Sequence, residues 1–303
     1  NIAPIFIGKY YSPAQLGVYN RAQGYAAMPS QNVTGVIANV SFPVLSQIQD
    51  DDERLAYNYR RMLKVSAFVI FPVMLMLSAL ARPLVITMIT AKWEACIILL
   101  QIICFSMMWY PIHAINLNLL QVKGRSDLFL RLEIIKKVLG LSILVITLPL
   151  GLAYFCLGNI VSSMFSLVIN TYYTGKLINV GYLKQMRDLL PIFGLSLFMW
   201  FCIHGINYFI PNMLLQIFVG GCVGLIIYVG VAFLFKFDEL KDVKYLLQRK
   251  PQKNDLQFYN FRVNRQLHRW GELYDICFQL NNVGLKLFIY ILTMNHRFDK
   301  LSI

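Results

Sequence analysis

The feature that most constrains this chain is a run without any charged side chain, from residue 138 to residue 174. A helix of roughly 20 apolar residues crosses a hydrocarbon core about 30 Å thick. The run is therefore too long for one crossing, and Pro149, Leu150 and Gly151 form the natural place for it to fold back. A soluble enzyme with one large core is excluded, because 57% of the 303 residues are hydrophobic and only 14% are charged, against roughly 25% in soluble domains.

The same pattern extends over residues 1–250 and predicts an all-α, polytopic transmembrane helix bundle. We expect seven full spans after a stub that ends near Gly8, and the first span is the most polar of the set. The spans are predicted at residues 16–45, 65–89 with a break at Arg82 and Pro83, 95–122 with a kink at Pro111, 130–148, 154–174, 189–208 and 213–235.

The loops between the predicted spans indicate orientation, because Lys and Arg are retained on the cytoplasmic side. Alternate loops are rich in these residues, including Lys123 and Lys184, while the turns at Pro149 and Pro211 have none. The net charge of +13 is therefore assigned to cytoplasmic loops and anionic lipid, and not to nucleic acid. Residues 251–303 have no run long enough to span, so we expect a cytoplasmic tail of unknown role. Because the chain opens at Asn1 inside an apolar stretch, we expect a fragment that lacks its N-terminal part.

Ionisable residues within spans cost about 2.5–3.5 kcal/mol for Arg at a helix centre, so they usually face a cavity and indicate function. Arg21 lies early in the most polar span, and Gln31 and Asn32 continue a hydrophilic lining. This pattern is typical of an anion-binding residue in a water-filled cavity. The alternative is an arginine near the helix end whose side chain extends to the membrane–water interface. In the third span His113 and Asn116 belong to a polar stripe that suits a sugar or headgroup path, or else hydrogen bonding between helices.

Carboxylates are expected only in loops and the tail, apart from Glu94 at a helix start, so no span is predicted to hold a buried acid that binds Na⁺ or a drug cation. No metal site or cofactor is predicted, and no H-E-x-x-H, Walker A or G-x-S-x-G pattern occurs. Catalysis by this chain is therefore not expected. Gly220 and Gly224 match the close-packing motif G-x-x-x-G, which favours packing within the bundle over dimerisation.

Three segments resemble a known family. These are residues 7–22, with the sequence I-G-K-Y-Y-S-P-A-Q-L-G-V-Y-N-R-A, residues 42–51, F-P-V-L-S-Q-I-Q-D-D ahead of a basic turn, and Ala91-Lys92-Trp93 before an apolar helix. They are similar to the Wzx-type polysaccharide or oligosaccharide flippases of the multidrug/oligosaccharidyl-lipid/polysaccharide exporter superfamily. Residues 1–250 resemble the C-terminal lobe of such a fourteen-helix protein.

The resemblance implies a two-lobed bundle whose central cationic cavity alternates between the two faces of the bacterial inner membrane. It implies transport of an undecaprenyl-pyrophosphate-linked oligosaccharide to the periplasmic leaflet for surface polysaccharide, with membrane lipids, a polysaccharide polymerase and chain-length machinery as partners. Arg21 would contact the pyrophosphate, and the first lobe, needed to enclose the cavity, is absent. The other substrate contacts that the resemblance implies are Gln23, Gln31, Asn32, His113 and Asn116.

Three other functions stay open. A cation-coupled drug or metabolite antiporter of the same superfamily is disfavoured because the spans are predicted to lack acids. A membrane-embedded glycan polymerase or ligase would carry a long extracytoplasmic loop with functional Arg and His, and no loop here is long. The third alternative is a purely structural membrane subunit. Only Arg21 and the polar first span argue against it.

Overall fold

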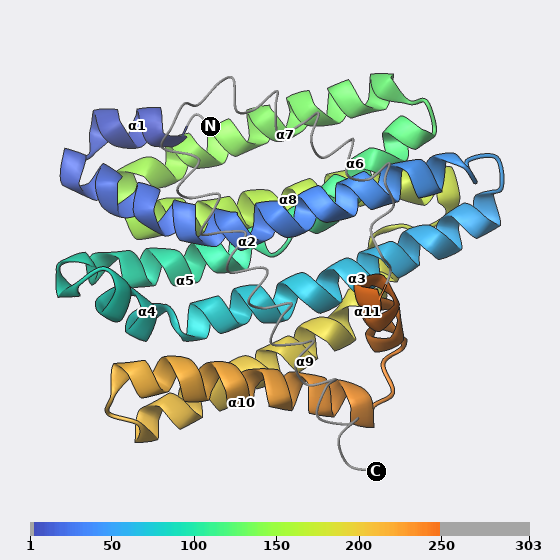
Figure 1. Cartoon of the computed structure of the whole chain (residues 1–303). Coiled ribbons are helices and arrows are strands. Elements are labelled where there is room, and N and C mark those ends of the chain that lie inside the picture. The colour runs from blue at the N-terminus through green and yellow to red at the C-terminus, as the bar shows by residue number, and fades with distance from the viewer. Residues whose placement is uncertain (1–2, 249–303) are drawn as a thin grey trace, which may run out of the picture. The chain divides into compact units, whose positions relative to one another are not determined.

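The computed structural model describes residues 3–248, and every regular element in that range is a helix, which confirms the predicted all-α fold (Figure 1). The chain separates into a compact unit, Asn1–Lys244, and a second unit, Tyr245–Ile303. The first unit is the one described below. The predicted tail, residues 251–303, lies outside the described residues.

The chain begins with α1 (Ala3–Tyr10), a short helix in place of the predicted stub, and continues into α2 (Pro13–Ser46), which has 34 residues. Ser12 starts α2 through a capping box. The Ser12 hydroxyl accepts a hydrogen bond from the Gln15 backbone N–H at 3.3 Å, and the Gln15 side chain accepts one from the Ser12 backbone N–H at 3.2 Å. The most polar predicted span is thus one long helix that packs along α3, α5 and α6 (Figure 1).

The next two predicted spans are each divided into two helices. They form α3 (Asp52–Ala79) and α4 (Ala81–Met88), then α5 (Ala95–Met107) and α6 (Tyr110–Val122), with the short 3₁₀ turn η1 (Ala91–Trp93) between the pairs. The second span is interrupted as predicted, two residues before Arg82: α3 ends at Ala79, and Pro83 lies in the first turn of α4, where a missing N–H costs no helical hydrogen bond. The third span is likewise interrupted near its predicted kink, because α5 ends at Met107 and Pro111 lies in the first turn of α6.

The charge-free run folds back where predicted. It forms α7 (Ser126–Thr147) and α8 (Leu152–Ile178), joined by the 3₁₀ turn η2 (Leu148–Leu150) and by Gly151, whose φ of +118° suits only glycine. The remaining helices are α9 (Tyr182–Phe209), α10 (Met213–Leu234) and α11 (Asp238–Gln248).

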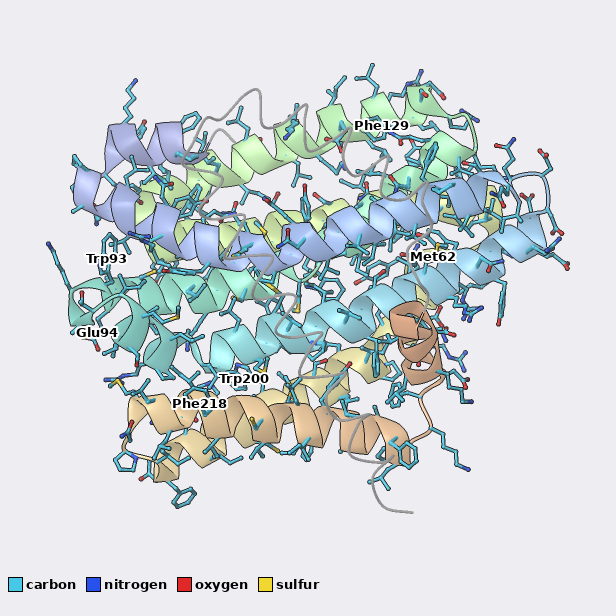
Figure 2. All side chains as sticks on the ribbon, in the orientation of Figure 1. Met62, Trp93, Glu94, Phe129, Trp200 and Phe218 are labelled. Atoms are coloured by element: carbon cyan, nitrogen blue, oxygen red, sulfur yellow. The ribbon has the colours of Figure 1, made fainter. Side chains whose placement is uncertain are left out.

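The centre of the bundle is aromatic and apolar. The ring of Phe71 on α3 lies with its centroid 5.1 Å from that of Trp109 and 6.1 Å from that of Phe193 on α9. Large apolar side chains also cover the outside, as Phe218 on α10 does with 68% of its surface exposed (Figure 2). Such an exterior suits hydrocarbon and not water, so the chain is a multi-pass membrane protein.

Five segments of residues 3–248 are long and apolar enough to cross a membrane, namely α3, the joined pair α5 and α6, α8, α9 and α10. The other two predicted spans form helices α2 and α7, which are not among these five. All seven predicted spans therefore coincide with helices. The number that crosses stays a prediction.

The expectation that acids lie only in loops and the tail was wrong. Glu133 lies within α7, inside the span predicted at residues 130–148. Asp188 lies within α9, because this helix begins at Tyr182, before the apolar run that indicated it. Each acid is paired with a base. Glu133 lies 2.5 Å from Lys136, and Asp188 lies 2.6 Å from Arg60.

Candidate functional site

One side of α2 is open at three glycines. Gly17, Gly24 and Gly35 lie on it, and a Cβ built on any of the three would meet no atom within 4 Å. At 100° per residue the side chains of Arg21 and Met28 project from the same side, and both are exposed. We call this side the open face of α2, and it consists of Gly17, Arg21, Gly24, Met28, Gln31, Asn32 and Gly35.

The open face gathers three of the six predicted site residues. Arg21, Gln31 and Asn32 are all exposed on it. Gln23 projects from the opposite side of α2 and is half-buried, so it does not join them. The helical period therefore brings a cation and two amides to one surface, where they can bind an anion and hydroxyl groups together.

Arg21 has an aromatic neighbour. Its guanidinium carbon lies 5.2 Å from the centroid of the Trp93 ring, a cation–π contact. Trp93 ends the turn η1 and lies at the same end of the bundle as Glu94 (Figure 2). Glu94 pairs with Arg82 at 3.6 Å, and the ion pairs found within residues 3–248 do not include Arg21. The charge of Arg21 is therefore not neutralised by a neighbouring carboxylate of the described residues.

His113 lies between α6 and α8, away from the open face. Its Nε2 lies 2.9 Å from the Ser163 hydroxyl, and its Nδ1 lies 3.4 Å from the Asn170 amide nitrogen. The Asn170 amide oxygen is buried and has no partner among the described atoms. Turning this amide over would let its oxygen accept from a protonated Nδ1. The structure therefore places His113 in a contact between two helices.

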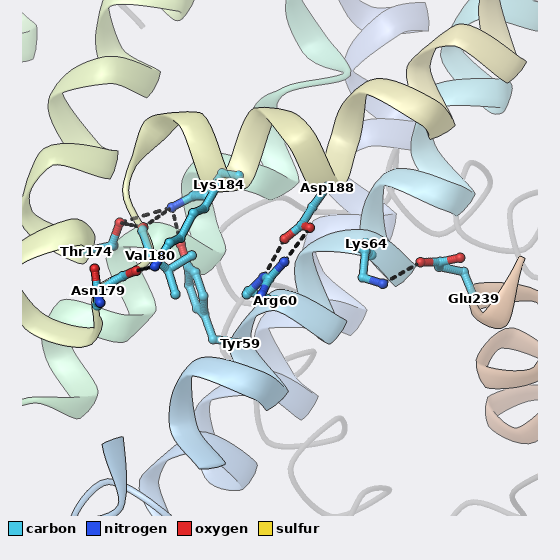
Figure 3. Close-up of polar contacts among 10 residues, drawn as sticks. Tyr59, Arg60, Lys64, Thr174, Asn179, Val180, Lys184, Asp188 and Glu239 are labelled. Atoms are coloured by element: carbon cyan, nitrogen blue, oxygen red, sulfur yellow. Dashed lines mark hydrogen bonds and ion pairs between the residues drawn. The ribbon is translucent and has the colours of Figure 1, made fainter. Parts of the chain in front are cut away.

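Asn116 belongs to a buried group that we call the amide cluster, which consists of Tyr59, Asn116, Thr174 and Gln185. Its amide oxygen accepts from the Tyr59 hydroxyl at 2.8 Å, and its amide nitrogen donates to the Gln185 side chain at 3.2 Å. Gln185 also donates to Thr174 at 3.0 Å and to the Val180 carbonyl at 3.1 Å (Figure 3). All four side chains are fully buried, so the cluster links α3, α6, α8 and α9.

Ion pairs lie beside the amide cluster. Arg60 on α3 binds Asp188 on α9, and Lys64, one turn further along α3, lies 2.9 Å from Glu239 on α11 (Figure 3). Arg61 also pairs with Asp242 on α11. The sequence interpretation missed Gln185 and Asp188 because they lie in the polar first turns of α9, before its apolar run begins. Two polar residues at the start of a long helix are the signal that could have indicated them.

An apolar groove runs between α7 and α8. It measures 520 Å³ and offers only one hydroxyl, so it can hold an alkyl chain but can do little polar chemistry. The groove is lined by Ile134, Ile135, Val138, Leu139, Ser142, Ile143 and Phe165.

Comparison with known proteins supports the resemblance predicted from the residues. The model of a family described as "Polysaccharide biosynthesis protein" matches residues 1–98, which include α1 to α4 and the open face of α2. The chain is similar to the lipopolysaccharide biosynthesis protein WzxC of Escherichia coli, with 27% identity over 48% of this chain and 30% of that protein. It is also similar to the succinoglycan biosynthesis transport protein ExoT of Rhizobium meliloti, with 21% identity over 82% of this chain and 51% of that protein.

A solved structure shows the same fold. The lipid II flippase MurJ in an inward closed conformation superposes with a TM-score of 0.60 and 19% identity, covering 73% of this chain and 48% of that chain. The chain thus spans about half, or less, of the length of the proteins it matches. The likeness to MurJ confirms the predicted helical bundle.

Proposed function

We propose that this chain is one lobe of a transporter that moves a lipid-linked oligosaccharide across a bacterial inner membrane. The transported lipid carries a diphosphate between an undecaprenyl chain and the sugars. The observation that carries the proposal is the open face of α2. This face presents an arginine not paired with any described carboxylate beside two amides, within the segment that the polysaccharide biosynthesis family matches.

The chemistry of the open face suits such a substrate. A guanidinium binds phosphate oxygens through two parallel charge-assisted hydrogen bonds, and these strengthen where water is excluded. Gln31 and Asn32 can donate to and accept from sugar hydroxyls. The glycines leave room for a ligand or a second lobe to approach the helix backbone. We therefore propose Arg21, Gln31 and Asn32 as substrate contacts, while Gln23, His113 and Asn116 stay predictions of the resemblance.

The transport step would be a rocking of two lobes around the substrate, as in other transporters with repeated halves. The amide cluster and the ion pairs of α3 connect the helices of this lobe, which suits a rigid-body motion. We propose a multi-pass protein of the inner membrane with its tail in the cytoplasm, working beside a polysaccharide polymerase and chain-length machinery. We propose that it is not an enzyme.

The names of two similar proteins support transport over the alternatives. ExoT is named a biosynthesis transport protein and MurJ a flippase. A cation-coupled antiporter needs a carboxylate free to bind the cation. Glu133 and Asp188, which lie within helices, are both held by bases, so neither is free for this role.

The test compares wild type, a gene deletion and Arg21→Ala in the full-length protein. Surface polysaccharide and lipid-diphosphate-linked repeat units retained in the membrane are both measured. We expect the deletion and Arg21→Ala to lose surface polysaccharide and to accumulate repeat units. Arg131→Ala, which removes an exposed arginine of α7, should behave as wild type.

Two results would change the proposal. A deletion strain that accumulates no lipid-linked repeat units would exclude the flippase, and the antiporter would become the working hypothesis. If only Arg21→Ala behaves as wild type, transport stands and Arg21 is an interfacial anchor.

A further inference from the structure

We propose that Trp93 is the positioning residue for Arg21, and that its indole ring holds the guanidinium on the open face of α2 in the orientation that binds a diphosphate. The inference rests on the proposed function, because it assigns a second residue to the same site. The inference also gives a role to the segment Ala91-Lys92-Trp93, which resembles the flippase family but is not part of the open face.

The contact between the two residues has the geometry of a cation–π pair. The guanidinium carbon of Arg21 lies 5.2 Å from the centroid of the ring, within the range of about 6 Å over which such pairs attract. Tryptophan is the most effective ring for this contact. Arg21 is exposed, whereas Trp93 is half-buried and packs against the hydrophobic core. The ring is therefore the fixed partner and the arginine is the residue held.

An aromatic partner suits this position better than an acid. A carboxylate would neutralise Arg21 and would compete with the phosphate oxygens for the same N–H groups. A ring orients the guanidinium without neutralising its charge. When the flat face of the guanidinium lies on the ring, its N–H edge stays free for bidentate contact with phosphate.

The turn that carries Trp93 is strained. Thr90, directly before η1, has a φ of +145°, a region that is essentially limited to glycine and is costly for a β-branched residue. The turn is closed by two hydrogen bonds, from the Trp93 N–H to the Thr90 carbonyl and from the Glu94 N–H to the Ala91 carbonyl, both at 3.1 Å. Such strain persists only where the surroundings fix it, and it concentrates at functional sites. Here the strained residue directly precedes the turn that carries the ring.

The other end of the turn is attached to α4. Glu94 lies 3.6 Å from Arg82, so the acid nearest to Trp93 in sequence is engaged with a different arginine. This arrangement leaves Arg21 with the ring and without a carboxylate among the described residues. The turn therefore gives two arginines different partners: Arg21 contacts the Trp93 ring, and Arg82 pairs with Glu94.

The experiment measures the affinity of the full-length protein, in lipid nanodiscs, for undecaprenyl diphosphate. The variants are Trp93→Leu, Trp93→Phe, Arg21→Ala and the double variant Arg21→Ala with Trp93→Leu. We expect Trp93→Leu to weaken binding about two- to fivefold, the range that an exposed cation–π pair supports. Trp93→Phe should retain most of the affinity. Trp200→Leu, which removes another half-buried tryptophan on α9, should bind as wild type.

The double variant separates positioning from direct contact. If Trp93 acts through Arg21, replacing the ring should cost nothing further once Arg21 is alanine, because the two effects are fully coupled. If Trp93→Leu weakens binding equally with and without Arg21, the positioning role is overturned and the ring contacts the ligand itself or supports the fold.

A second readout does not depend on the ligand. In protein labelled with 5-fluorotryptophan, the ¹⁹F resonance assigned to Trp93 by Trp93→Phe should shift on Arg21→Ala. An unmoved resonance would overturn the contact itself. If Arg21→Ala leaves the diphosphate affinity unchanged, the substrate contact of the proposed function fails and the positioning role fails with it. If Arg21→Ala weakens binding but Trp93→Leu does not, only the positioning role fails.

Discussion

Arg60 on α3 and Asp188 on α9 form a two-point ion pair in which both nitrogen–oxygen distances are 2.6 Å (Figure 3). The two residues are 128 positions apart in the sequence. Tyr59, the neighbour of Arg60, enters the amide cluster, and Lys64 binds Glu239. Arg60 and Asp188 lie just before the predicted apolar spans of their helices, so the pair joins α3 to α9 at that end of the two spans.

We expect Arg60→Lys to destabilise the folded lobe by about 1–2 kcal/mol. Lysine keeps the charge but cannot form the two parallel hydrogen bonds of the guanidinium. A hydrogen bond to a charged group contributes roughly 1.5–3 kcal/mol to stability when it is buried. The Arg60 side chain is 43% exposed, which reduces the effect. The measurement is the thermal unfolding midpoint of the purified protein in detergent.

The control for this prediction is Arg54→Lys. Arg54 is 72% exposed and lies 4.0 Å from Asp51, so its replacement should leave the midpoint unchanged. Equal midpoints for Arg54→Lys and Arg60→Lys would show that the pair with Asp188 does not hold the helices together.

Gln185→Leu should destabilise the protein by about 1–3 kcal/mol, the cost of leaving buried polar groups without partners. The substitution removes hydrogen bonds to Tyr59, Asn116 and Thr174 at a site that is fully buried. Gln121→Leu is the matched control, because Gln121 is exposed at the end of α6. The comparison is made by thermal unfolding, and a similar midpoint for the two variants would contradict the role given to the cluster.

The sequence could predict where helices lie but not where they end. The apolar runs indicated all seven long segments, and Gly151 marks the fold-back because of its positive φ. Helix ends are set by local polar contacts instead. Asp51 accepts from the Arg54 N–H at 3.0 Å, and Asn212 accepts from the Leu214 N–H at 2.9 Å. An apolar run therefore marks only part of a helix, which explains why Asp188, in the polar first turns of α9, was assigned to a loop.

Part of the candidate site could also be predicted. Arg21, Gln31 and Asn32 share a face because the helical period alone brings them together. Trp93 and Gln185 could not be assigned roles in this way, since their partners are distant in sequence. Gln185 meets Tyr59 across 126 positions, and no local pattern encodes that contact.

Gly224→Val should destabilise the packing of α10 on α9 by about 1–3 kcal/mol, the usual cost of overpacking. A Cβ at Gly224 would lie 2.7 Å from the Ile203 side chain on α9, and one at Gly220 would lie 3.0 Å from Leu80. The G-x-x-x-G motif therefore contacts helices of its own bundle, in agreement with the predicted packing.

Gly221→Val provides the control for Gly224→Val. It makes the same substitution on α10, but a Cβ at Gly221 would meet nothing within 4 Å. Unfolding midpoints and the oligomeric state by light scattering are measured for both. A change of oligomeric state for Gly224→Val with an unchanged midpoint would favour dimerisation over internal packing.

The last prediction concerns orientation and connects it to the candidate site. Single cysteines are introduced as Lys184→Cys, Pro211→Cys and Lys92→Cys in a full-length protein whose native cysteines have been replaced. If Lys-rich loops are cytoplasmic, Lys184→Cys should be shielded from an impermeant thiol reagent in intact cells and labelled in inverted vesicles. Pro211→Cys and Lys92→Cys should both be labelled in intact cells, because successive crossings return the turn η1 to the same side as the turn between α9 and α10.

The opposite pattern would invert the topology. It would place Arg21 and Trp93 at the cytoplasmic end, where the substrate would enter and not where it would leave. Labelling of Pro211→Cys without Lys92→Cys would instead show that α7, which lies between the two positions and is not among the five apolar candidate spans, does not cross the membrane.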